Sequence, residues 1–229
     1  MPAISPYVVL TSRLIEQFEA ECEIAGMKSG AREFQIEPDA SSGSYFWAAG
    51  WLLRAAGERT ITVNDWPVPG WQIDAAFVDF LPLPAAISRE GQLGDSIMTA
   101  IVLAPLHAAP VKFTDLGRLR VQECERVAAL RAELTKCGGC VVETGDTLEV
   151  FPSPLHGAEI ETYNDHRMAM CFAILGLKIP GIKIKNPACA KKTFPNFFQK
   201  LAAPPPRGLG AVILDGTGRR LAAGELFAD

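Results

Sequence analysis

The sequence places several cationic side chains close to the predicted starts of helices, where they could bind a small anion. His166 and Arg167 directly follow Asp165, and Arg126 and Lys192 stand near two further predicted helix starts. Arginine binds a carboxylate or phosphate through a planar fork of donors, whereas lysine acts as a point charge. The net charge of the whole chain is −4, which argues against a general nucleic-acid binder. A local cluster of cations in such a protein favours a small substrate that carries several negative charges.

The same residues also allow a purely structural interpretation. Arg120, Glu123 and Arg126 recur at three-residue steps, so they could form exposed ion pairs along one helix. His166 considered alone would more often be an ordinary helix residue than a catalyst. We favour the anion site because these cations occur together with three similar helix starts.

The elements that position the cations form three similar segments. Each opens with an aspartate and continues as an apolar helix, and the three aspartates are Asp39, Asp95 and Asp165. An aspartate is a good N-cap because its carboxylate accepts hydrogen bonds from the free N–H groups of the first turn. A strand is predicted after each helix, over residues 60–63, 110–114 and 182–185, and then a second helix, over 75–81, 124–136 and 193–201. We therefore expect three copies of one α/β unit, with helix N-termini that converge on an anion-binding face.

The chain also has flanking segments outside the three units. An amphipathic helix is predicted over residues 7–20 and a strand over 33–36. The run from Ala202 to Arg207 contains three prolines and predicts a stiff linker, and an Asp-Gly turn within 211–221 predicts a small hairpin. The expected domain boundaries are thus 1–37, 38–202 and 203–229.

Composition narrows the function classes further. No run of about 18 apolar residues lacks a charge or a proline, so we expect a cytoplasmic protein without a membrane segment. The six cysteines are expected to be free thiols. Cys137 and Cys140 form a CxxC motif, but it falls where a helix ends on glycines, and no second ligand pair accompanies it. We therefore expect no metal and no cofactor.

Three long strings of the sequence resemble one enzyme family. They are Ile-Glu-Pro-Asp-Ala-Ser-Ser (36–42), Tyr-Asn-Asp-His-Arg-Met-Ala-Met (163–170) and Lys-Thr-Phe-Pro (192–195). From about Pro6 to Ala202 the chain resembles the C-terminal half of a 5-enolpyruvylshikimate-3-phosphate synthase (3-phosphoshikimate 1-carboxyvinyltransferase). The related transferase that acts on UDP-N-acetylglucosamine is expected to lack the Lys-Thr-Phe-Pro run. The resemblance implies two similar domains, each an inside-out α/β barrel of three βαβαββ-like units with helices inside and sheets outside.

The resemblance also implies a reaction and a set of site residues. The family transfers the enolpyruvyl group from phosphoenolpyruvate to shikimate 3-phosphate and releases phosphate, a step of the shikimate pathway to chorismate and the aromatic amino acids. By position in the motifs, Asp95 would be the base at the shikimate hydroxyl, and Glu123 would act on the phosphoenolpyruvate methylene. The expected substrate-binding residues are Tyr7, Gln122, Arg126, His166, Arg167 and Lys192.

The sequence departs from the family pattern in four respects. It contains one set of units where the family has two, so activity is expected to require a separate chain that supplies the N-terminal domain. Gln122 stands where a lysine is expected, and Arg118 where an asparagine is usual. Ser5 is one residue too close to Tyr7 to be given a role. The link between residues 77 and 95 is short, so the middle unit is expected to be truncated. Two alternatives stay open, an inactive anion-binding fragment and half of a split enzyme.

Overall fold

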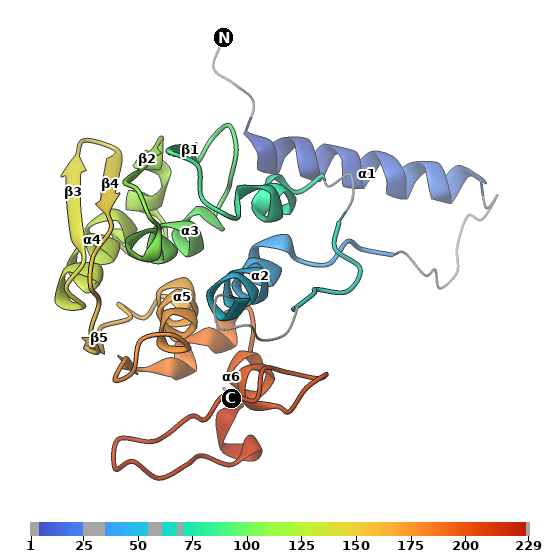
Figure 1. Cartoon of the computed structure of the whole chain (residues 1–229). Helices are drawn as coiled ribbons and strands as arrows, with labels where there is room; N and C mark the ends of the chain where they lie inside the picture. Colours follow the sequence, from blue (N-terminus) through green and yellow to red (C-terminus); the bar gives the residue numbers. More distant parts are fainter. Residues whose placement is uncertain (1–4, 25–34, 55–60, 68–70, 228–229) are drawn as a thin grey trace.

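The protein is a mixed α/β structure in which helices occupy the centre and a small sheet lies at one side (Figure 1). The computed structural model describes residues 5–24, 35–54, 61–67 and 71–227. Its α-helices are α1 (Pro6–Ile24), α2 (Ala40–Arg54), α3 (Ile97–Leu103), α4 (Arg126–Lys136), α5 (His166–Gly176) and α6 (Phe197–Ala202). The strands are β1 (Ala86–Ser88), β2 (Val111–Thr114), β3 (Cys140–Thr144), β4 (Thr147–Phe151), β5 (Glu159–Ile160) and β6 (Lys183–Ile184). Short 3₁₀ helices are η1 (Ile73–Phe80), η2 (Ala104–Leu106), η3 (Leu116–Val121), η4 (Pro187–Lys192) and η5 (Ala223–Leu226).

Helices α2, α3 and α5 pack against one another and form the centre of the core. Every residue of α3 is buried, and most of α5 is buried as well. A helix that is apolar around its whole circumference has to be covered on all sides, as the sequence predicts for these segments. The three helices that begin after the three aspartates therefore lie side by side.

The larger sheet has the strand order β1-β2-β4-β3. Strands β1 and β2 run parallel, and the other two pairs are antiparallel, with Val111 opposite Val150 and Phe113 opposite Leu148. These four side chains are fully buried and alternate with more exposed ones, because successive side chains of a strand point to opposite faces. One face of the sheet thus joins the helical core. Strands β5 and β6 form a second, two-stranded parallel sheet.

The structure confirms most of the predicted helices and corrects several boundaries. The segment 75–81 lies mostly within the 3₁₀ helix η1, and the helix predicted over 193–201 begins only at Phe197. The strands predicted over 110–114 and 182–185 are present as β2 and the two-residue β6.

The strands predicted over 60–63 and 33–36 are wrong where they can be judged. Residues 61–63 and 35–36 are not in a strand, and positions 60, 33 and 34 lie outside the described residues. Ile61 packs instead on α2, where a Cβ added to Gly50 would lie 3.2 Å from the Ile61 Cβ. A β-branched residue supplies strand propensity, but a strand also needs a neighbour with which to pair.

The segment between η1 and α3 contains a single short strand, β1. A complete helix and two further strands do not fit between these elements. The sequence-based expectation of a shortened middle segment agrees with this arrangement, although three equivalent units are not evident from the described elements alone.

The predicted hairpin near the C-terminus is present as one antiparallel bridge between Leu214 and Arg220. The tail then folds back on α6, where the Gln199 side chain donates a hydrogen bond of 2.8 Å to the Ala223 carbonyl. Leu226 is buried against the core. The tail therefore covers part of α6 rather than extending from it.

Helix α1 runs across one end of the molecule and extends away from the body (Figure 1). The structure confirms the predicted helix and lengthens it at both ends. Val8, Ile15 and Phe18 are exposed on it, while Leu10 and Leu14 are half-buried. Within the described residues, no helix is both long and apolar enough to cross a membrane.

Candidate anion-binding site

The carboxylate of Asp95 lies at the start of α3 and is surrounded by three guanidinium groups. Arg89 Nη2 lies 2.8 Å from Asp95 Oδ1, and Arg167 Nε lies 3.3 Å from Asp95 Oδ2. Arg126 Nη1 is the third, 3.8 Å from Asp95 Oδ2. The three arginines come from the end of β1, from α4 and from α5. The fold therefore brings distant parts of the chain to one carboxylate.

Asp95 is not the N-cap that the sequence suggested. The N–H and hydroxyl of Ser96 donate hydrogen bonds of 3.1 and 2.5 Å to Asp74 Oδ1. The hydroxyl of Ser41, in the first turn of α2, donates to the other oxygen of Asp74. Asp74, from η1, thus joins the starts of α2 and α3, and this leaves the Asp95 carboxylate available to the arginines.

The other two predicted N-caps are confirmed. The Ser42 N–H donates to Asp39 Oδ1 at 3.1 Å, at the start of α2. The Arg167 N–H donates to Asp165 Oδ1 at 2.8 Å, at the start of α5.

Arg126 connects the starts of α3 and α5. Its Nε donates to Asp165 Oδ2 at 2.6 Å, and its Nη1 donates to Gln122 Oε1 at 2.7 Å. The Gln122 amide nitrogen in turn lies 3.4 Å from Asp95 Oδ1. Only 2% of the Arg126 side chain is exposed, so the alternative of an exposed ion pair along a helix is wrong for this residue.

Tyr7 brings α1 to the same cluster. Its hydroxyl oxygen accepts a hydrogen bond of 3.2 Å from the Asp95 N–H. Gly94 allows this approach, because a Cβ at that position would lie only 2.5 Å from the Tyr7 hydroxyl oxygen. Burial raises the pKa of Tyr7, and the nearby carboxylates of Asp74 and Asp95 raise it further. The phenol is therefore a neutral group at physiological pH.

His166 is buried beside Asp165 at the first position of α5. Its Nδ1 lies 3.9 Å from Asp165 Oδ1 and makes no hydrogen bond within the described part of the chain. Burial lowers the pKa of His166, and the positive charge of Arg167 lowers it further, against an opposite effect of Asp165. The imidazole is therefore neutral near pH 7.

Glu123 and Lys192 form a more exposed pair at the edge of this cluster. Lys192 Nζ lies 2.5 Å from Glu123 Oε1. The hydrogen bond from Lys192 and its positive charge lower the pKa of Glu123, against a smaller opposite effect of desolvation. A carboxylate that can reach both solvent and a lysine is able to exchange a proton.

The charged groups of the cluster are held in their ionised forms. Burial alone would raise the pKa of Asp95, but the charges of Arg167, Arg89 and Arg126 outweigh it and lower that pKa. Burial likewise opposes the ionisation of Asp165, and the hydrogen bonds from Arg126 reverse the effect and lower its pKa. Burial disfavours the Arg167 cation, yet the surrounding Tyr45, Asp95 and Asp74 raise its pKa. Three arginines thus lie among three buried aspartates, Asp74, Asp95 and Asp165, and the guanidinium forks are the groups that suit an anion.

Residues 89–201 of the chain match the family model of EPSP synthase (3-phosphoshikimate 1-carboxyvinyltransferase). The 3-phosphoshikimate 1-carboxyvinyltransferase of Opitutus terrae is 40% identical over 225 residues, and that of Pseudomonas syringae pv. syringae is 38% identical over 211 residues. Each comparison covers 86% of this chain. The chain belongs to the EPSP synthase family. It spans about half the length of these relatives, 51% and 50% respectively.

A solved EPSP synthase from Acinetobacter baumannii has a similar fold. The TM-score is 0.54 at 20% sequence identity, over 77% of this chain and 48% of that one. The likeness places the fold of this chain with that of the EPSP synthases.

The part of the chain that matches the EPSP synthase model contains every predicted site residue except Tyr7. The structure brings four other predicted residues to Asp95, namely Tyr7, Gln122, Arg126 and Arg167. His166 adjoins them, and the Glu123–Lys192 pair lies at the edge.

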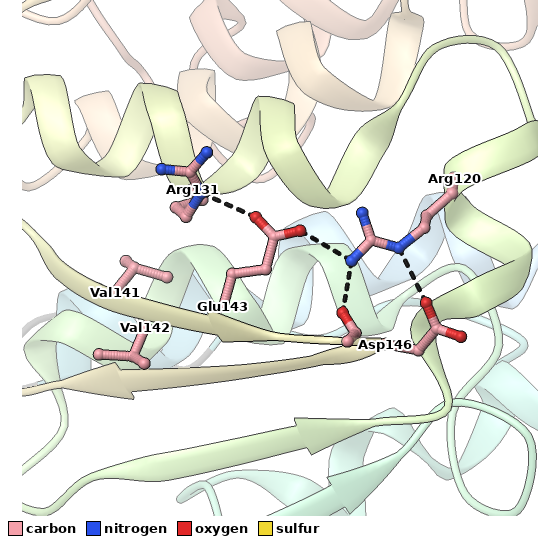
Figure 2. Close-up of a pocket in the computed structure, with 7 residues that line it drawn as sticks. Arg120, Arg131, Val141, Val142, Glu143 and Asp146 are labelled. Carbon is pink, nitrogen blue, oxygen red and sulfur yellow. Dashed lines mark hydrogen bonds and ion pairs between the residues drawn. The ribbon is translucent and has the colours of Figure 1, made fainter.

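Arg120 lies outside this cluster. Figure 2 shows its guanidinium bound to Glu143 and Asp146 in a shallow pocket beside β3, at 2.8 Å each. It also lies 2.9 Å from Glu125. In the EPSP synthase fold of this chain, Arg120 therefore ties η3 to the β3–β4 hairpin, and three carboxylates already use its donors.

Sequence analysis missed Arg89 and Asp74 as parts of the site. Arg89 is only 6% exposed, and its N–H donates to the Thr114 carbonyl at 3.1 Å, which continues the pairing of β1 with β2. Neither residue belongs to the family strings on which the sequence interpretation rested. The one local signal for Arg89 is its position, directly after the short strand β1 and shortly before Asp95.

The described residues contain no group of three or more histidine, cysteine, aspartate or glutamate side chains arranged to hold a metal ion. In the CxxC motif, Cys137 is buried at the end of α4, and Cys140 is exposed at the start of β3. Gly138 between them has a φ of +89°, which favours glycine at a helix end. The motif thus accounts for the passage from helix to strand.

Proposed function

We propose that this chain forms one wall of an EPSP synthase active site and corresponds to the C-terminal half of such an enzyme. The reaction would transfer the enolpyruvyl group of phosphoenolpyruvate to shikimate 3-phosphate and release phosphate. The observation that carries the proposal is the Asp95 carboxylate held among Arg89, Arg126 and Arg167 at the joined starts of α2, α3 and α5. Helix N-termini and arginines together suit a small, multiply charged anion.

The proposed roles follow the environment of each side chain. Asp95 is ionised and buried, so it can accept the proton of the shikimate hydroxyl as the ether bond forms. Glu123 would give a proton to the phosphoenolpyruvate methylene carbon in the addition step. It would take a proton back from the resulting methyl group as phosphate leaves. The groups proposed to hold the two substrates are Tyr7, Gln122, Arg126, His166, Arg167 and Lys192.

The Glu123–Lys192 pair suggests how the acid is prepared. In the free protein Lys192 keeps the pKa of Glu123 low, so the carboxyl is ionised. A phosphate group bound by Lys192 would draw the ammonium away from Glu123, and the negative charge of the phosphate would favour the protonated carboxyl. Glu123 would then be able to donate its proton only after phosphoenolpyruvate has bound.

Under this proposal, residues 1–37 are a remnant of the N-terminal domain. Residues 38–202 are the C-terminal domain, and residues 203–229 are the linker and tail. Three units in an inside-out barrel would place α2, α3 and α5 inside and the sheets outside. The central packing of these helices supports that arrangement.

A separate chain would supply the other wall. Helix α1 carries Tyr7 into the site and presents Val8, Ile15 and Phe18 to solvent. Val8 and Ile15 are two helical turns apart and so share one face. An exposed apolar face next to the site suits docking of the N-terminal domain.

Complementation tests the proposed activity. The chain would be mixed with the separately produced N-terminal half of the Opitutus terrae relative, and phosphate release from the two substrates would be measured. We expect release only when both pieces are present. Glu123→Gln should abolish it, whereas Arg131→Gln, on the exposed side of α4, should leave it intact. If the mixture binds both substrates but releases no phosphate, the proposed activity is wrong.

A second function, anion binding without turnover, is favoured by the three guanidinium groups gathered at Asp95. Calorimetric titration of the chain alone with phosphoenolpyruvate tests it. Binding that is retained in Glu123→Gln and lost in Arg167→Gln would support an anion-binding module, provided that complementation gives no turnover. Absence of binding by the isolated chain would exclude this function.

A further inference from the structure

Helix α4 carries a second buried charged residue, Glu133, two turns after Arg126. Residues two turns apart lie on one face of a helix. Both side chains of this face are directed at the same loop, residues 161–165. Arg126 binds Asp165 at one end of the loop, and Glu133 binds its other end.

Glu133 uses both carboxylate oxygens to hold the loop. The Tyr163 hydroxyl donates to Oε1 at 2.8 Å, and the Glu161 N–H donates to Oε2 at 3.1 Å. Lys136 Nζ lies 2.8 and 2.9 Å from the same two oxygens and balances the charge. Glu133 is fully buried, so its carboxylate depends on these donors in place of water.

The held loop has an unusual backbone. Tyr163 and Asn164 both lie in the left-handed region, with φ of +53° and +56°. Two consecutive residues of this kind without glycine persist where surrounding contacts over-determine them. Those contacts are the bonds to Glu133, a bond of 3.0 Å from the Asn186 amide to Asn164 Oδ1, and the bond of 2.8 Å from the Asp165 N–H to the Thr162 carbonyl.

We propose that Glu133 is a positioning residue for the anion site, which clamps the 161–165 loop so that Asp165, His166 and Arg167 begin α5 in the correct place. The loop leads directly into these three residues, and its left-handed turn sets the direction in which α5 starts. The identity of the anion rests on the proposed function, whereas the clamp itself concerns only this chain.

The alternative is that Glu133 merely stabilises the fold. Lys136 is 48% exposed, and its ion pair with Glu133 lies within α4. This pair adds little stability and does not fix the geometry of the loop. The hydrogen bonds from Tyr163 and Glu161, in contrast, are made to the loop itself. A clamp and a general stabiliser therefore differ in what happens to His166 when one of these bonds is removed.

The deciding experiment is an NMR titration of the histidine side chains in the full chain. Tyr163→Phe removes one clamp bond without burying a new polar group, and Glu133→Gln removes the charge. We expect both variants to raise the pKa of His166 toward its ordinary value, because a loosened loop admits water. Lys136→Met retains both loop contacts and should leave His166 unchanged.

Phosphoenolpyruvate titrations with the same variants complete the test. If the wild-type chain binds it, Tyr163→Phe should weaken binding about two- to tenfold, as expected for one lost hydrogen bond. If the wild-type chain does not bind it, anion binding by the isolated chain is excluded, but the His166 titration still decides whether the clamp exists. An unchanged His166 pKa in both Tyr163→Phe and Glu133→Gln, with a lower melting temperature, would show a stabilising role only and overturn the proposal.

Discussion

Arg126 binds Asp165 through two hydrogen bonds, of 2.6 Å from Nε and 3.3 Å from Nη2, although the residues are 39 positions apart in the chain. Both side chains are almost completely buried. The pair joins the start of α4 to the start of α5, and so it fixes the two helices that carry Arg126, His166 and Arg167.

Removing one member of this pair should be strongly destabilising. Arg126→Met would leave the Asp165 carboxylate buried without its partner, and we expect the free energy of unfolding to fall by about 3 to 5 kcal/mol. The measurement is urea denaturation followed by circular dichroism. Arg131→Met, at a partly exposed ion pair on the same helix, should cost about 1 kcal/mol or less. The double variant Arg126→Met, Asp165→Asn should recover part of the loss. A cost below about 1 kcal/mol for Arg126→Met would contradict a stabilising buried pair.

Stability should decrease in two stages as the pH is lowered. The folded protein keeps His166 neutral, so protonation of the unfolded chain below its ordinary pKa of about 6.5 favours unfolding. Asp95 and Asp165 have lowered pKa values in the folded state, so their contribution is present above about pH 4 and is lost as the pH falls through those values. Urea denaturation at a series of pH values would measure both stages. His166→Gln should remove the first stage and leave the second, and an unaltered first stage would show that another group causes it.

Replacing Gln122 by lysine tests the departure from the family pattern. The Gln122 oxygen accepts a bond from Arg126, and an ammonium cannot accept it. We expect Gln122→Lys to lower the free energy of unfolding by about 1 to 2 kcal/mol. The added positive charge should at the same time increase the affinity for phosphoenolpyruvate. Gln122→Met, which removes the same acceptor without adding charge, is the matched control, and it should lose stability without gaining affinity. Equal affinities of the two variants would show that a charge at this position does not reach the anion.

Neutralising Asp95 should separate binding from turnover. Asp95→Asn removes a negative charge that pairs with Arg89, Arg126 and Arg167. Phosphoenolpyruvate should therefore bind about tenfold more tightly, since a like charge a few ångströms away opposes an anion. Phosphate release in the complemented enzyme should be lost, because the proposed base is absent. Calorimetry and the phosphate assay give the two values. Unchanged affinity together with full turnover would show that Asp95 is not part of the site.

The sequence predicts local features of the structure correctly because these features depend on residues that are neighbours in the chain. The apolar runs predict the buried helices α2, α3 and α5, and the aspartates at positions 39 and 165 do cap their helices. Asp95 stands at an equivalent position and yet is not a cap. Its partners, Arg126 and Arg167, lie on other helices, and Asp74 instead holds Ser96, the residue directly before α3. The strand expected over residues 60–63 is absent at 61–63 for a related reason, since pairing depends on a neighbour that local propensity does not supply.

By itself, the sequence determined the family, the buried helices and most of the residues of the candidate site, but not Arg89 or Asp74. Apolar periodicity and the motif strings carry that information along the chain. Only the tertiary structure decided which aspartate caps a helix, which one gathers the arginines, and that Glu133 holds the loop before α5. These relationships join residues that are distant in the sequence, and ion pairs and hydrogen bonds between them form only when the packed core brings their elements together.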